Sequence, residues 1–135
     1  MIILSALLAA TPAAGELEVS IERLRSARGR VHLCLTRDRA HFPNCASDPH
    51  ALKRSVSAGT VKVRVEGVRP GAYALSVFHD ENGNGKLDTF AGIPREGFGF
   101  SRNPVIRFGA PRFRQVVIDL EPGFARHTVR MQYLL

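Results

Sequence analysis

Five segments of this 135-residue chain alternate apolar and polar residues, a sixth has apolar residues on both faces, and no segment between them has the spacing of an amphipathic helix. A period of two places the apolar side chains of a strand on one face, which must be buried against a second layer. The segments are residues 17–22, 31–36, 61–66, 72–79, 114–120 and 128–133. Because a chain of this length forms one domain, we expect an all-β fold: a single antiparallel β-sandwich of six to seven strands, immunoglobulin-like or transthyretin-like in outline.

The segment Ala72–His79 is apolar on both faces, which predicts the central strand. Residues 37–59 lose the alternation and contain several turn formers, so they predict a long connection with one short helical turn near residues 49–56. Residues 89–111 are rich in Gly, Pro and Phe and show no sustained period.

Residues 1–15 carry no charged side chain, are apolar from Ile2 to Ala10 and end in small residues, which is typical of a secretory signal peptide. We therefore expect a signal peptide at 1–15 and a β-sandwich domain at 16–135, secreted into the periplasm, with no transmembrane segment in the mature chain. The alternative is a buried N-terminal helix. Cys34 and Cys45 fit an oxidising compartment and predict a structural disulfide, the alternative being two free buried thiols.

The formal charge of +7 lies entirely outside the leader and favours anionic neighbours, such as phosphate head groups or acidic polysaccharide. Secretion makes nucleic acid the least expected of these partners. The alternative is that the arginines reflect coding composition alone.

The segment Asp80–Asp88 carries the clearest chemical pattern of the chain. Side-chain oxygens stand at positions 1, 3 and 5, a glycine at 6, a backbone carbonyl at 7 and a carboxylate at 9; the residues are Asp80, Asn82, Asn84, Gly85, Lys86 and Asp88. This pattern predicts a calcium site. Position 12 is Ala91 instead of a bidentate Glu, so we expect a weak affinity, about 10⁻⁴ to 10⁻³ M, unless Glu96 folds back onto the loop. The alternative is a turn in which Asn-Gly pairs supply left-handed backbone.

Arginines and phenylalanines are interleaved after this loop, and Arg102, Arg107, Phe98 and Phe100 are candidates for binding an anionic glycan or lipid of the cell envelope without metal. The alternative is that the rings close one end of the sandwich. Catalytic patterns are weak, because the histidines show no metal-ligand spacing and Ser101 has no nucleophile elbow. We expect no enzymatic activity; a transthyretin-like hydrolase that pairs His79 with Ser101 is the third hypothesis.

Three stretches resemble a family of small secreted bacterial proteins catalogued as a domain of unknown function: His79–Asp88, Gly92–Ser101 and Phe108–Phe113. The family signature reads approximately HDENGNGKLD, GIPKEGYGFS and RFGPPSF. The resemblance implies export and a β-sandwich, but no established activity. The acidic loop is also similar to the structural calcium loops of bacterial surface β-sandwich repeats. Together these features predict a secreted envelope protein with a calcium-binding loop and a binding or structural role.

Overall fold

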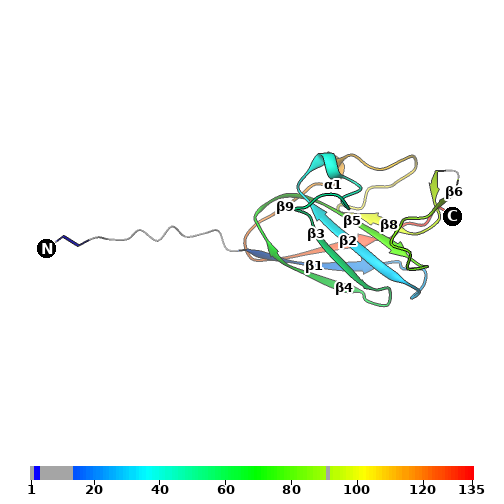
Figure 1. Cartoon of the computed structure of the whole chain (residues 1–135), viewed down its shortest axis with the longest axis horizontal. Helices are drawn as coiled ribbons and strands as arrows, with labels where there is room; N and C mark the ends of the chain where they lie inside the picture. The colour runs from blue at the N-terminus through cyan, green and yellow to red at the C-terminus, as the bar shows by residue number, and fades with distance from the viewer. Residues whose placement is uncertain (1, 4–13, 91) are drawn as a thin grey trace.

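The computed structural model describes residues 2–3, 14–90 and 92–135. The predicted signal peptide, residues 1–15, lies mostly outside the described residues. From residue 14 onward, strands dominate the chain, and they form two facing sheets (Figure 1).

The first sheet has three strands in the order β10-β1-β4. Their bounds are Gly15–Glu22 for β1, Lys62–Val68 for β4 and Phe124–Arg130 for β10. The antiparallel expectation holds for β1 and β4, whereas β1 and β10 run parallel, with Leu17 opposite Ala125. The N-terminal strand therefore occupies the middle of its sheet.

The second sheet has five strands in the order β3-β2-β5-β8, with β9 also paired to β5. Their bounds are Arg30–Thr36 for β2, Leu52–Ser57 for β3, Gly71–Asp80 for β5, Phe98–Phe100 for β8 and Ile118–Leu120 for β9. A small hairpin of β6 (Thr89–Phe90) and β7 (Ile93–Pro94) stands apart from both sheets. The predicted all-β sandwich is confirmed.

Strand β5 is buried on both faces, as its sequence predicts. Leu75 and Val77 face the main core between the sheets, where they join residues of β1 and β2 such as Leu17 and Leu35. On the opposite face Ala74 packs in a second cluster, which contains Phe98, Phe100 and Val116 with Phe42, Ile106 and Phe113 at its edge. A strand covered on both faces cannot alternate, because both sets of side chains are withdrawn from water.

Several elements differ from the prediction. Residues 52–57 form β3 where a helical turn was expected; this strand pairs with β2 and is only half-buried on its inner face. A 3₁₀ helix, η1, spans Arg39–His41, and a single helical turn, α1, spans Phe113–Val116, where a strand was expected. The last strand starts four residues earlier and ends three residues earlier than its alternation indicated.

The predicted disulfide between Cys34 and Cys45 is confirmed; it ties β2 to the connection that follows η1, across a Cα–Cα distance of 6.6 Å. None of the helices in the described part of the chain is long and apolar enough to cross a membrane.

Candidate functional site

The site begins at Asp80, the last residue of β5, whose side chain is completely buried. Its carboxylate lies 2.9 Å from His32 Nε2 on the neighbouring strand β2, and it accepts hydrogen bonds from the backbone N–H groups of Asn84 (3.1 Å) and Gly85 (2.7 Å). Burial raises the pKa of Asp80, but the bonds from His32, Gly85 and Asn84 outweigh burial and hold this pKa below its ordinary value. Asp80 is thus an ionised anchor for the loop that follows.

The loop is curled by glycines and by short side-chain bonds. Gly83 and Gly85 have φ values of 68° and 78°, a left-handed conformation that glycine adopts without steric cost. In the same turn the Asn84 N–H donates to Asn82 Oδ1 (3.3 Å), and the Lys86 N–H donates to Asn84 Oδ1 (2.9 Å). The side-chain oxygens at alternate positions are thereby held toward the inside of one turn.

Asp88 closes the loop. Its two carboxylate oxygens accept from the side-chain amides of Asn82 (2.6 Å) and Asn84 (2.8 Å). Bonds from Asn84 and then Asn82 lower the pKa of Asp88 below its ordinary value. The structure therefore brings together the predicted side chains of Asp80, Asn82, Asn84 and Asp88, while Lys86 takes part through its backbone N–H.

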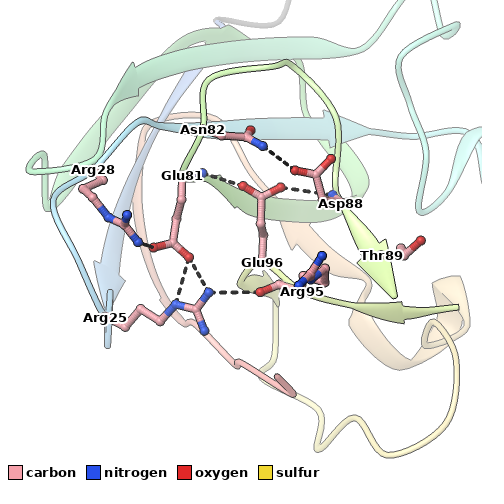
Figure 2. A pocket seen from close by; sticks show the side chains of 8 residues that line it. All are labelled: Arg25, Arg28, Glu81, Asn82, Asp88, Thr89, Arg95 and Glu96. Atoms are coloured by element: carbon pink, nitrogen blue, oxygen red, sulfur yellow. Dashed lines mark hydrogen bonds and ion pairs between the residues drawn. The ribbon is translucent and has the colours of Figure 1, made fainter. Parts of the chain in front are cut away.

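Glu96 folds back onto this loop and clamps its two ends. Its buried carboxylate accepts the backbone N–H of Glu81 at 2.6 Å and that of Asp88 at 3.0 Å, and the neighbouring Arg95 N–H donates to the Asp88 carbonyl at 2.8 Å (Figure 2). Glu96 is the acid that the sequence suggested as a distant ligand. In the structure the Glu96 carboxylate accepts hydrogen bonds from backbone N–H groups, and it thereby connects the start of the turn to its end.

Glu81 links the loop to the connection between β1 and β2. Its side chain, which is 9% exposed, accepts hydrogen bonds from Arg25 Nε (2.8 Å), Ser26 Oγ (2.9 Å) and Arg28 Nη2 (3.1 Å). The Arg25 guanidinium also lies over the Tyr133 ring, with its Cζ 4.5 Å from the ring centroid. Burial raises the pKa of Glu81, but these hydrogen bonds outweigh burial and lower the pKa to about 2. No pattern in the sequence predicts this cluster, because its partners are 53 to 56 residues apart along the chain.

An open cavity of about 490 Å³ lies beside these groups, lined by arginines from two loops and by the loop carboxylates (Figure 2). Arg25 and Arg28 both point at Glu81 in this view, and the three arginines of the lining are matched by three carboxylates, those of Glu81, Asp88 and Glu96. The lining is therefore polar without a strong excess of either charge.

The loop offers a hard cation amide and carbonyl oxygens in addition to the carboxylates of Asp80 and Asp88. Among the described residues no group of three or more His, Cys, Asp or Glu side chains is placed to hold a metal ion. Calcium, however, also accepts amide and carbonyl oxygens. The hydrogen bonds above use one lone pair each on Asp80 Oδ1, Asn82 Oδ1 and Asn84 Oδ1, and each such oxygen has two.

Of the four residues predicted to bind an anionic glycan or lipid, two are buried in the core and two are exposed to solvent. The rings of Phe98 and Phe100 are buried in the cluster beneath β5, so they cannot stack on a ligand in this conformation. Arg102 is exposed and its guanidinium donates to the Arg114 carbonyl at 3.3 Å, while Arg107 is exposed farther along the same connection. These four side chains do not form one surface.

His79 and Ser101 are both buried and are bonded to other groups. His79 Nε2 lies 2.7 Å from the Arg28 carbonyl, so it carries the proton, and Nδ1 lies 2.8 Å from the Tyr133 hydroxyl. Ser101 Oγ donates to the Val116 carbonyl and accepts from the Leu75 N–H. The structure does not form the nucleophile and base pair that the hydrolase hypothesis requires.

A family model described as "Uncharacterized protein conserved in bacteria (DUF2141)" matches residues 19–127, which include every strand from β2 to β9 and the whole Asp80–Asp88 loop. No curated protein and no solved structure matches the chain.

Proposed function

The chain belongs to the bacterial family DUF2141, whose description assigns no activity, and from this starting point we propose a binding or structural role outside the cytoplasm, with a calcium ion held weakly by the Asp80–Asp88 loop. The ion would be bound by Asp80, Asn82, Asn84 and Asp88, with the Lys86 carbonyl as a further ligand. Its effect would be to order the loop and the segment that Glu96 attaches to it.

One observation carries this proposal: the N–H groups of Asn84 and Gly85 both donate to the buried carboxylate of Asp80. They orient the first ligand of the pattern and bring positions 1, 3 and 5 onto one turn. A site oriented in this way loses less conformational entropy when the ion binds. Only Asp80 and Asp88 supply charge, which supports weak binding of the kind found in extracellular modules.

Two features support a location outside the cytoplasm. The Cys34–Cys45 disulfide is of a kind that persists in oxidising compartments, and the signal-like segment at 1–15 favours export. The periplasm is the compartment we propose. Extracellular calcium concentrations also suit a site of millimolar affinity better than cytosolic ones do.

We propose a role without catalysis for a chemical reason. Buried His79 and Ser101 have no access to a substrate and are satisfied by structural partners. The exposed cavity contains carboxylates and guanidinium groups that bind one another, an arrangement that is typical of a structural ion-pair network.

Thermal unfolding in EDTA and in about 5 mM calcium tests the proposal. With the affinity expected here, calcium should stabilise the folded protein by about 1 to 2 kcal/mol, which raises Tm by several degrees. Asp88→Asn should lower this calcium-dependent shift strongly. The matched control is Asp119→Asn on β9, which removes an exposed carboxylate away from the loop and should leave the shift intact.

Amide chemical shifts provide a second readout that does not depend on stability. Calcium, but not an equal concentration of magnesium, should shift the N–H resonances of Gly83 and Gly85 in the wild-type protein. If neither Tm nor these resonances respond to calcium, the loop is a metal-free turn held by Glu96, and the calcium proposal is refuted.

A further inference from the structure

The connection between β8 and α1 presents two large apolar side chains to water. Val105 is 79% exposed and Phe108 is 96% exposed, whereas Ile106 between them packs against the cluster beneath β5. The connection lies on the same side of the molecule as η1 and α1 (Figure 1). A single exposed apolar side chain is ordinary, but two of them three residues apart on one connection form a candidate contact surface.

Hydrogen bonds fix the base of this connection to β10 and the residues after it. Asn103 donates to the Thr128 carbonyl and accepts the Arg130 N–H, both at 2.8 Å. The Gln132 side chain accepts the Ile106 N–H at 3.2 Å and donates to the Pro104 carbonyl at 3.1 Å. These four bonds hold residues 103–106 in place, so the outward direction of Val105 is imposed by the fold.

Within the segment that carries the apolar tip, residues 97–118, all charged side chains are cationic; the nearest acid beside η1 is the exposed Asp38, which is paired with His41. No Asp or Glu occurs between Glu96 and Asp119, and four exposed arginines lie in that interval: Arg102, Arg107, Arg112 and Arg114. A fifth, Arg39 of η1, lies over the Phe113 ring at 5.6 Å from its centroid. The connection thus carries exposed apolar side chains and a series of arginines on the same segment of chain.

We propose that residues 102–114 dock onto an anionic lipid bilayer, with Phe108 and Val105 inserted at the interface and the arginines at the phosphate head groups. An anionic bilayer has a negative surface potential, which attracts the arginines, and an apolar layer just beneath it, which accommodates the apolar side chains. A soluble polyanion would satisfy the arginines but leave Phe108 in water. The proposal does not depend on calcium.

Cosedimentation with vesicles of phosphatidylcholine and phosphatidylglycerol (7:3), in EDTA, tests the docking. We expect binding that weakens at high salt and is absent with phosphatidylcholine alone. Arg107→Gln should weaken binding about fivefold, and Phe108→Ser about tenfold or more. The matched controls are Arg69→Gln and Val61→Ser, two exposed positions elsewhere on the surface, which should each leave affinity within about twofold.

A tryptophan reporter tests insertion directly, because the chain contains no Trp. The emission of Phe108→Trp should shift to the blue on these vesicles and stay unchanged with heparin, a soluble polyanion, whereas Val61→Trp should not respond to either. Absence of vesicle binding, full binding by Phe108→Ser, or equal losses at Arg107 and Arg69 would each overturn the proposal. Because EDTA is present throughout, these outcomes are independent of the calcium site.

Discussion

Gly29, in the connection between β1 and β2, lies directly against the backbone that leaves β5. A β-carbon at this position would overlap the Asp80 carbonyl oxygen and come within 2.7 Å of the Glu81 carbonyl. Its φ of 73° is also left-handed. Both the space and the backbone conformation therefore require glycine, and the position of Gly29 decides how closely Arg28 approaches His79 and Glu81.

Gly29→Ala should lower the free energy of unfolding by at least about 3 kcal/mol, because backbone overlap cannot be relieved by a side-chain rotation. Urea unfolding measures this. The control is Gly109→Ala, which has a φ of 67° but open space around its α-carbon and should cost only about 1 to 2 kcal/mol. Equal losses in the two variants would mean that conformation alone, and not close approach, matters at Gly29.

The residues of the loop illustrate what can be predicted from spacing. Asp80, Asn82, Asn84 and Asp88 meet because their separation along the chain is short and the glycines between them allow one turn. The partnership of Glu81 with Arg25 and Arg28 depends on two distant connections lying side by side. No local rule predicts that contact, since it is decided by the pairing of β2 with β5.

Among the elements, β2 and β5 were predictable and β3 was not. Strands β2 and β5 bury whole faces, so their apolar residues are strongly patterned. Strand β3 is an edge strand whose inward residues, Leu52, Arg54 and Val56, are only half-buried, and the arginine among them hides the alternation. The short strand β8 has only three residues, too few to establish a period.

The disulfide stabilises β2 by shortening the free connection after it. Closing a loop with a sequence separation of 11 removes chain entropy from the unfolded state worth about 3 kcal/mol. Replacing both Cys34 and Cys45 by Ala should therefore lower the free energy of unfolding by about that amount in urea, without changing the far-UV spectrum of the folded protein.

The reduced wild-type protein is the control for this variant and should unfold at the same urea concentration. If the double variant is far less stable than the reduced protein, then packing of the sulfur atoms, and not loop closure, would account for the loss. Cys45 is buried, which makes this comparison necessary.

Across the described part of the molecule, five carboxyl groups have pKa values below their ordinary range: Asp38, Asp48, Asp80, Glu81 and Asp88. A carboxyl group whose pKa is lower in the folded than in the unfolded state stabilises the fold above its unfolded pKa. This stabilisation is lost as pH falls through the folded value. We therefore expect stability to be flat with respect to these groups above about pH 5 and to decline steadily below it.

Glu81→Gln should make this acid decline shallower between the ordinary pKa of a glutamate, 4.5, and the folded value of about 2. The shift corresponds to roughly 3 kcal/mol at most, so the variant should be less stable at neutral pH and should approach the wild type near pH 2. Chemical unfolding at a series of pH values measures the difference. Parallel curves for the two proteins would show that Glu81 titrates normally in the folded state.

The parallel pairing of β1 with β10 determines when the first sheet can form during synthesis of the chain. Strand β1 lies between β4 and β10, and its partner residues in β10 are more than 100 positions later in the chain. While the chain is being synthesised, β1 emerges before the other described strands, and its second edge stays unpaired until residue 130 has followed. The sandwich therefore closes only after β10 has been released, and until then the exposed edge of β1 needs protection from other chains.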